Sequence, residues 1–237
     1  MDQSSKKIAK EISLRLVIEL LLFLASLFVF IVITDEIVIE KEGAVDDFAF
    51  KKLAAITSAP LTQVMRVITF FGSWYFLLPA YLLLIGWLFA SRKKTALWLD
   101  ITTIGITSTI VLFSIKAIFQ RQRPLDPILN KVPGFSFPSG HSFSSFVFIG
   151  LLTYIISELA IRRRLKWIYG ILLFFFAWLI AISRVYLRVH FASDVVAGFF
   201  LSIIWLGVSY RVLHIVRRKR NSINAIPSKP ANGKPIL

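Results

Sequence analysis

Three short clusters of polar residues lie beside long apolar segments, and they hold the side chains best suited to chemistry. The clusters span 116–124, 138–141 and 183–194. The chain has 3 His residues, and two of them, His141 and His190, fall in these clusters. Together the clusters offer cations, a helix start, two imidazoles and a carboxylate. This set suits an oxyanion with several oxygens and indicates phosphoryl transfer, in which catalysis is mostly positioning and charge stabilisation.

The first cluster, Lys116-Ala-Ile-Phe-Gln-Arg-Gln-Arg123-Pro124, predicts a pair of phosphate-binding cations. Lys116 and Arg123 are seven residues apart, roughly two helical turns, which places them on one helix face. Lys116 directly follows an apolar run, where a cation is costly unless it pairs with an anion or snorkels to water. Contact of these cations with lipid head groups is the alternative interpretation.

The second cluster, Pro138-Ser139-Gly140-His141, predicts the start of a helix that binds an anion. Ser139 is a favourable N-cap, and Gly140 lets a ligand approach the backbone closely. The free amides of a helix start form an anion site. His141 would then stand where it can donate a proton to a leaving oxygen. The alternative is an ordinary capped helix with an interfacial His.

The third cluster joins Ser183-Arg184 to His190 and Asp194. His190 and Asp194 are four residues apart, so on a helical path they share a face. The carboxylate can hold the proton of one ring nitrogen and leave the other nitrogen free to attack. Arg184 brings a planar fork suited to phosphate. The alternative is a structural His–Asp pair at the start of the last apolar segment.

The composition around these clusters is that of a membrane protein. Hydrophobic residues make up 57% of the 237 residues, and the mean hydropathy is +0.73. Six segments are long and apolar enough to span a bilayer: 14–34, 74–91, 95–117, 142–160, 167–184 and 195–214. No cleavage site of small residues follows the first, so we expect a retained span and not a signal peptide.

Residues 44–58 predict a short amphipathic helix between the first two spans. Val45, Ala49, Leu53 and Ile56 recur there at helical spacing. Packing over the bundle is the favoured interpretation, and a helix at the outer interface that helps lipid reach the site is the other. The predicted fold is therefore all-α. It is a bundle of six transmembrane helices in one domain over 1–220, with this interfacial helix and a disordered cytoplasmic tail over 221–237.

The basic residues predict the orientation of the bundle. The net charge is +15, and many of the cations lie in the N-terminal segment, the links 92–94 and 161–166, and the segment 217–220. With six spans these segments share one side, which the positive-inside rule makes the cytoplasm. Both termini are then cytoplasmic and the three clusters face outside. Charges placed between apolar runs favour contact with membrane lipids over nucleic acid.

The pattern Lys116-x6-Arg123-Pro124, Pro138-Ser139-Gly140-His141 and Ser183-Arg184-x5-His190-x3-Asp194 resembles the three-part signature of the type 2 phosphatidic acid phosphatase family. The family's six-span bundle matches the predicted span count. The resemblance implies that His190 is the nucleophile, that Asp194 orients it, and that His141 is the general acid and base. It implies phosphate binding by Lys116, Arg123, Ser139, Gly140 and Arg184. Arg121 and Arg188 lie outside the signature and are assigned no catalytic role.

The resemblance implies a metal-independent lipid phosphate phosphatase of the plasma membrane that needs no cofactor. The chain has no Cys, and only Asp126 and Asp194 provide carboxylates near the clusters, so no two-metal site is apparent. For a bacterial protein the resemblance points to undecaprenyl pyrophosphate or phosphatidylglycerophosphate, reached from the outer leaflet. Transfer of phosphate to an acceptor other than water remains a second hypothesis.

A non-enzymatic lipid-phosphate binder or transporter is a third hypothesis. Glu19, Asp100 and Glu158 lie inside spans, but each is near a cytoplasmic end, so no chain of charges crosses the membrane. The related vanadium haloperoxidases share the anion pocket but are soluble, and six spans argue against them. The third His, His214, lies at the opposite end of the last span from the clusters and is expected to contact head groups.

Overall fold

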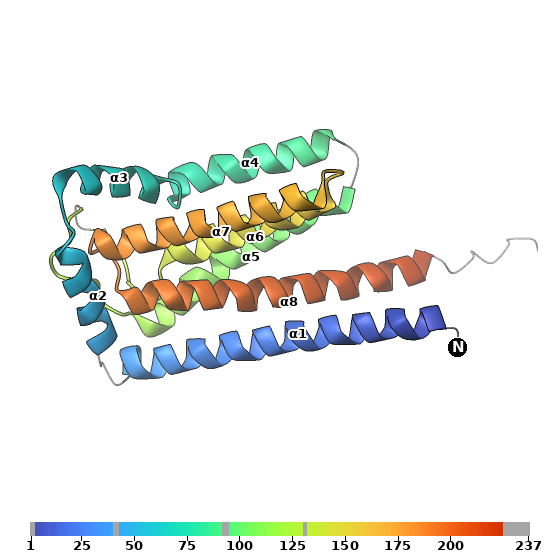
Figure 1. Ribbon diagram of the computed structural model, residues 1–237, viewed down its shortest axis with the longest axis horizontal. Helices are drawn as coiled ribbons and strands as arrows, with labels where there is room; N and C mark the ends of the chain where they lie inside the picture. The colour runs from blue at the N-terminus through green and yellow to red at the C-terminus, as the bar shows by residue number, and fades with distance from the viewer. Residues whose placement is uncertain (1–2, 40–42, 92–94, 130–131, 225–237) are drawn as a thin grey trace, which may run out of the picture.

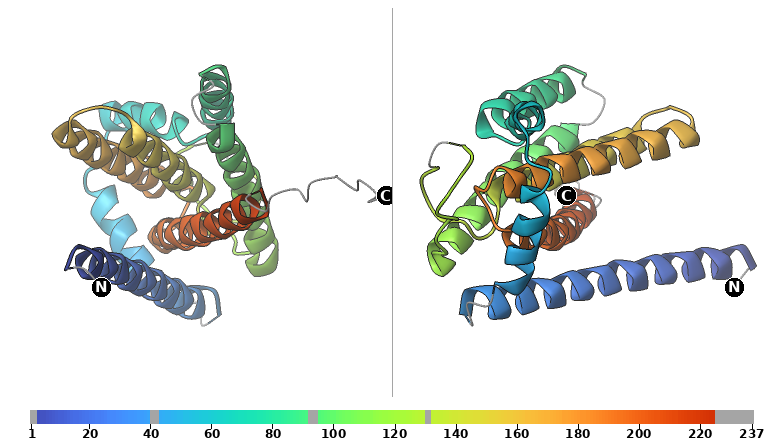
Figure 2. Two further views of the ribbon diagram at one scale, coloured as in Figure 1. Left: turned by 90° about the vertical axis from the view of Figure 1, so that its right-hand side faces the viewer. Right: turned by 60° about the vertical axis from the view of Figure 1, so that its left-hand side comes forward.

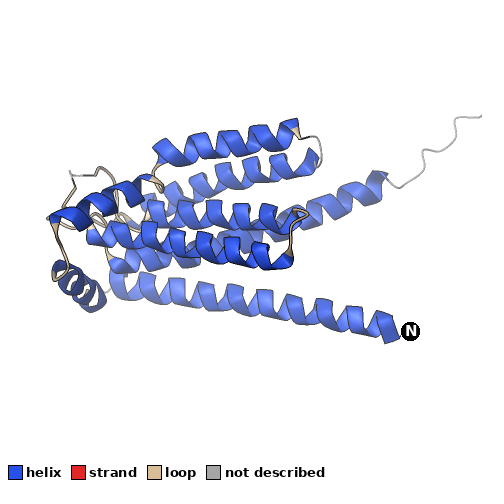
Figure 3. Cartoon of the chain, turned by 45° about the horizontal axis from the view of Figure 1, so that its top comes forward, coloured by secondary structure: helices blue, strands red, loops and turns tan. Residues whose placement is uncertain are grey.

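Helices make up most of the part of the chain that the structure describes. The computed structural model describes the backbone of residues 3–39, 43–91, 95–129 and 132–224. Within these ranges it contains helices and no strand, as Figure 3 shows. The elements are α1 (Gln3–Thr34) with a π-helical turn after it (Asp35–Ile39), α2 (Ala44–Ala54), α3 (Ala59–Phe70), α4 (Trp74–Ala90), α5 (Thr95–Phe119), α6 (Gly140–Glu158), α7 (Arg163–Tyr186) and α8 (Ala192–Asn224). The predicted all-α fold is confirmed.

Six stretches of these helices are long and apolar enough to cross a membrane, which confirms the predicted architecture. They are Leu16–Ile37, Ala59–Ala90, Leu97–Phe119, Gly140–Glu158, Arg163–Tyr186 and Ala192–Arg217. Many of their apolar side chains point away from the bundle, among them Phe28, Leu83 and Phe113. An apolar surface of this extent suits a lipid environment.

The second span begins earlier than predicted. Hydropathy placed its start at residue 74, whereas the apolar stretch begins at Ala59 because α3 leads into α4 through a tight turn. That turn requires Gly72, where a Cβ atom would lie 2.4 Å from Cγ2 of Ile180 on α7. The close approach lets α3 pack against α7 while α4 packs against α5.

The helices are arranged so that one end of the bundle collects the polar clusters. α6, α7 and α8 pack together, and α1 lies along α8 (Figures 1 and 2). A buried core between α5, α6 and α8 holds these helices in place, with Ile101, Ile104, Phe143 and Val147 at most 1% exposed. α2 crosses the end at which α5 leads into the 120–139 loop and α7 leads into α8, as Figure 1 shows. The start of α1 and the end of α8 lie at the opposite end.

α2 packs against the bundle, as the favoured interpretation of its apolar residues predicts, but only part of the predicted apolar face is used. Ala49 and Leu53 contact the buried residues of α6, α7 and α8, whereas Val45 and Ile56 are 58% and 56% exposed. The most deeply buried residue of α2 is Asp46, at 1% exposed. Periodicity finds apolar residues, but the burial of a carboxylate depends on a partner from a distant segment.

α2 is also shorter than predicted. It ends at Ala54 and not at residue 58, because Ser58 is the N-cap of α3 and Pro60 lies in the first turn of that helix. Proline is well suited to a first turn, where its missing amide would have had no intrahelical acceptor.

The end of the bundle away from α2 carries ion pairs between helices. Glu19 Oε2 lies 2.8 Å from Nη2 of Arg211, and Asp100 pairs with Arg217. α8 runs to Asn224, so the first residues of the predicted tail are helical. The rest of that tail and the 92–94 link lie outside the described residues, so the predicted disorder and the domain boundary stay predictions.

Candidate active site

The two cations of the first cluster meet through a loop and not along a helix face. α5 ends at Phe119, and Gln120 adopts the left-handed conformation (φ 46°). The prediction that Lys116 and Arg123 share one helix face is therefore wrong. Both instead donate to the carbonyl oxygens of residues 134–136, Lys116 at 2.7 and 3.2 Å and Arg123 at 2.9 Å. The shared loop brings the two cations to the same place.

His190 and Asp194 meet at the start of α8. That helix begins at Ala192, so His190 precedes it, and the predicted helical path between the two residues is wrong. Their proximity arises from the cap: Asp194 Oδ2 accepts the amide of Phe191 at 3.0 Å and lies 3.4 Å from Nδ1 of His190. A side chain in the first turn that bonds back to the N-cap amide is half of a capping box. One carboxylate thus starts the helix and faces the imidazole.

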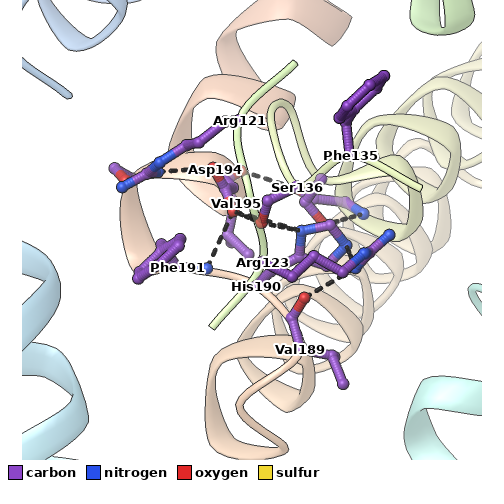
Figure 4. Close-up of polar contacts among 12 residues, drawn as sticks. Arg121, Arg123, Phe135, Ser136, Val189, His190, Phe191, Asp194 and Val195 are labelled. Atoms are coloured by element: carbon purple, nitrogen blue, oxygen red, sulfur yellow. Dashed lines mark hydrogen bonds and ion pairs between the residues drawn. The ribbon is translucent and has the colours of Figure 1, made fainter. Parts of the chain in front are cut away.

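The guanidinium of Arg123 defines which nitrogen of His190 is free to react. Nη1 of Arg123 lies 3.1 Å from Nε2 of His190 and donates to the Val189 carbonyl at 2.8 Å (Figure 4). Because a guanidinium can only donate, Nε2 must present its lone pair, and the ring proton lies on Nδ1, toward Asp194. Nε2 therefore faces a cation.

Burial keeps the imidazole of His190 neutral. The side chain is 2% exposed. Desolvation lowers its pKa well below the ordinary 6.5, and the hydrogen bond and charge of Asp194 oppose that effect. Desolvation likewise lowers the pKa of Arg123 from 12.5, while the Asp194 charge raises it. At neutral pH the site therefore holds a neutral ring beside a charged guanidinium.

The predicted helix start is present at α6. Ser139 is its N-cap, with Oγ accepting the amide of Ser142 at 3.4 Å, and its own amide donates to the Asp194 carbonyl at 3.0 Å. Gly140 and His141 are the first two helical residues, so their amides have no intrahelical acceptor. A Cβ atom on Gly140 would lie 3.9 Å from Cε of Lys116, which places that cation beside the helix start.

Arg184 is buried at the end of α7 with part of its guanidinium unused. The side chain donates from Nη1 to Oγ1 of Thr69 on α3 at 2.6 Å. Its Nε is buried and lacks a hydrogen-bond partner within the described part of the chain. A buried N–H group without an acceptor is costly, and an anion bound at this site would remove that cost.

His141 completes the site. Electrostatic interactions connect it to four other predicted residues: Arg184, His190, Arg123 and Lys116. A Cβ atom at Gly72 would lie 3.1 Å from Cδ2 of the His141 ring, so the α3–α4 turn forms the wall beside it. All eight residues predicted from the three clusters therefore gather at one end of the bundle.

The model of the PAP2 superfamily matches residues 96–218, which include all three clusters. The chain belongs to the PAP2 superfamily. It is 33% identical over 181 residues to phosphatidylglycerophosphatase B of Bacillus subtilis (strain 168). The matched region covers 76% of this chain and 89% of that protein. This PAP2 chain is therefore a lipid phosphatase, a hydrolase of the membrane.

Solved structures show the same fold. The crystal structure of a transmembrane PAP2-type phosphatidylglycerolphosphate phosphatase from Bacillus subtilis matches this PAP2 chain with a TM-score of 0.71 and 26% identity, over 86% of this chain and 98% of that one. Aquifex aeolicus LpxE matches with a TM-score of 0.52 and 25% identity, over 68% of this chain and 92% of that one.

Ser136 and Gly198 also support the PAP2 site, and sequence reasoning missed both. Ser136 is fully buried; its hydroxyl donates to Oδ2 of Asp194 and lies 3.3 Å from Nδ1 of His190 (Figure 4). At Gly198 a Cβ atom would lie 3.0 Å from the carbonyl oxygen of Ser139, so α8 must pass α6 without a side chain there. Gly198 lies four residues after Asp194 and therefore on the same face of the helix. A glycine at that position was the signal in the sequence that another segment packs closely there.

The residues described do not bring three or more His, Cys, Asp or Glu side chains together as metal ligands. The predicted independence of metal remains a prediction about the reaction.

Proposed function

We propose that this PAP2 lipid phosphatase acts without a metal, through a phosphohistidine formed at His190. One observation carries the proposal: Nε2 of a buried imidazole faces the guanidinium of Arg123 at 3.1 Å, while Asp194 faces the other ring nitrogen. A nitrogen lone pair beside a phosphate-binding cation is the arrangement that attack on phosphorus requires.

In the first step, Nε2 of His190 attacks the terminal phosphorus, and the bond from phosphorus to the lipid-side oxygen breaks. His141 gives its proton to that oxygen, so the lipid leaves protonated. The three cations, Lys116, Arg123 and Arg184, offset the charge on the equatorial oxygens. The product of this step is the phosphohistidine, whose ring charge the buried Asp194 carboxylate offsets.

In the second step, His141 is neutral and takes a proton from water. The water oxygen attacks the phosphorus, and the bond from phosphorus to Nε2 of His190 breaks. The electron pair of that bond returns to the ring nitrogen, and inorganic phosphate leaves. Proton and charge balance are restored for the next cycle.

Phosphate release by the purified protein in EDTA tests the proposal. We expect release from phosphatidylglycerophosphate, undecaprenyl pyrophosphate or phosphatidic acid at a rate that added Mg²⁺ does not raise. A strict requirement for added metal would contradict the mechanism. A phosphorylated acceptor in place of inorganic phosphate would indicate a transferase, and lipid binding without any product would indicate a binder.

A basic pocket beside Arg123 supports a substrate with a second phosphate. The pocket has a volume of about 430 Å³ and is lined by Lys51 of α2, Arg188 and one acid, Asp126, with apolar residues between them. Neither Lys51 nor Arg188 forms a side-chain hydrogen bond or ion pair within the described residues. Undecaprenyl pyrophosphate and phosphatidylglycerophosphate each carry a second phosphate on the lipid side of the scissile bond, and phosphatidic acid does not.

Changing Lys51 and Arg188 together to Ala is expected to raise KM about tenfold for the lipids with two phosphates, because two charge-assisted contacts are lost. KM for phosphatidic acid is expected to stay within about twofold, since it has no second phosphate. Steady-state assays of all three lipids measure this. Lys52→Ala is the control, because Lys52 is exposed on the same helix and lies over the Phe48 ring. Equal changes for all three lipids would contradict the assignment.

We further propose that both termini are cytoplasmic and that the site faces outside the plasma membrane. The basic N-terminal, 161–166 and 217–220 segments and the three clusters support this, because they belong to opposite ends of the six spans. A tag on the C-terminus should resist protease added to intact cells and be digested once the cells are opened. Digestion in intact cells would reverse the proposed orientation.

A further inference from the structure

The face of Asp194 that is turned away from His190 is occupied by an arginine outside the signature. Nη1 of Arg121 lies 2.7 Å from Oδ1 of Asp194, whereas the imidazole faces Oδ2. Figure 4 shows Arg121 and His190 on opposite sides of Asp194. The guanidinium also stacks on the Phe191 ring, 4.0 Å from its centroid, which fixes its plane. The carboxylate is thus held between a cation and the proposed nucleophile.

A second buried carboxylate shares the same guanidinium. Asp46 of α2 pairs through Oδ2 with Nη2 of Arg121 at 2.8 Å. Its Oδ1 accepts the amide of Ser193 at 2.8 Å, and its Oδ2 accepts the Ser193 hydroxyl at 2.7 Å. Ser193 is the second residue of α8, so Asp46 caps that helix from another element of the chain.

This network connects α2 to the proposed nucleophile through two carboxylates, the Arg121 guanidinium and Ser193. Asp46 and Asp194 are 1% and 0% exposed, and one cation lies between them. Buried carboxylates need such pairing, and removal of one partner leaves the others uncompensated. Arg121 pairs with both carboxylates, so its pairing with Asp46 affects how strongly it offsets the negative charge of Asp194. The electrostatic effect of Asp194 on His190 therefore depends on both ion pairs.

We propose that Asp46 and Arg121 are positioning residues of the phosphatase, which set the place and the effective charge of Asp194 behind His190. This inference rests on the function proposed above. It makes α2 a part of the active site, with Asp46 as its contribution. Neither residue lies among the eight predicted from the three clusters.

The first test compares Asp46→Asn with Asp47→Asn. Asp47 is the next residue of α2 and is exposed, so it controls for a lost charge on the same helix. We expect Asp46→Asn to lower kcat at least about tenfold through misplacement of Asp194. KM should change less than about twofold, because Asp46 does not contact the phosphate-binding cations. Asp47→Asn should behave as the unaltered protein.

The second test uses the acid limb of kcat/KM, which reports groups of the free enzyme. Arg121→Gln removes the cation beside Asp194, so the pKa of His190 should rise and the acid limb should move up by about one pH unit. Arg121→Lys should restore most of the original profile. Asp46→Asn removes an anion and should leave the limb in place or move it down.

The other charged or titratable groups around His190 stay unchanged in these variants: Lys116, Arg123, His141 and Arg184. A purely structural role predicts loss of activity with an unmoved acid limb in Arg121→Gln, and that result would overturn the proposal. So would equal kcat values for the two Asp→Asn variants. The unaltered protein and His190→Ala are assayed beside them. If the unaltered protein is inactive, the proposed function itself fails, whereas normal activity in every α2 and Arg121 variant refutes only this inference.

Discussion

Replacing His190 with Ala is expected to lower phosphate release by at least about 10⁴-fold, because the proposed nucleophile is lost. Asp194 and the three cations proposed to bind phosphate remain, so lipid should still bind. Labelling with a substrate that carries ³²P in its terminal phosphate should yield an acid-labile, base-stable phosphoprotein in the unaltered enzyme and none in the variant. This stability pattern is that of a phosphoramidate, the bond expected at a histidine nitrogen.

His214→Ala is the matched control, since it removes an exposed imidazole from the other end of α8. Its activity should equal that of the unaltered protein. Rapid turnover by His190→Ala, or a phosphoprotein that survives the change, would place the nucleophile on another residue and refute the proposed mechanism.

Replacing His141 with Ala is expected to lower turnover of natural lipid substrates by about 10²–10⁴-fold, the usual contribution of a general acid or base. The loss should depend on the leaving group. A soluble aryl phosphate needs no proton on its departing oxygen, so its first step should be nearly spared, while attack by water on the phosphohistidine stays slow. The variant should therefore accumulate the phosphorylated form, seen as a burst of aryl alcohol and as trapped ³²P.

The double variant His141→Ala, His190→Ala gives the control, because it should show neither burst nor label. An equal loss for lipid and aryl substrates, with no accumulation of phosphoprotein, would show that His141 binds the substrate and does not transfer protons.

The membrane architecture could be predicted because its physical cause is local. A helix in lipid must be apolar over about 20 residues, so each span can be recognised from the composition of its own segment. Hydropathy alone therefore predicts the six spans. It places the start of the second span at residue 74, whereas the apolar stretch runs from Ala59 through a turn at Gly72 that packs closely against Ile180 on α7. A contact of that kind leaves no periodic signal near residue 72.

The residues proposed for chemistry were also found from the sequence, since they lie in three short clusters with distinctive composition. The paths that join them were predicted less well. Lys116 and Arg123 meet through a loop, and His190 meets Asp194 through a helix cap, where a continuous helix was expected in each case. Spacing along the chain shows which residues are near one another, but the loop and cap geometry depends on backbone hydrogen bonds with distant residues.

The supporting residues became visible only in the folded chain. In the sequence, Asp46 is one of six acidic residues between positions 35 and 47. Arg121 is an arginine outside the family signature, as Arg188 is. Their pairing spans 75 positions of sequence, and it buries a carboxylate that hydropathy would leave exposed. The apolar pattern of a segment reflects whether that segment faces lipid, protein or water, so it can be recognised in the sequence itself. Ion pairs, close glycine contacts and shared guanidinium groups depend on which helices pack side by side, and this is settled only when the whole bundle assembles.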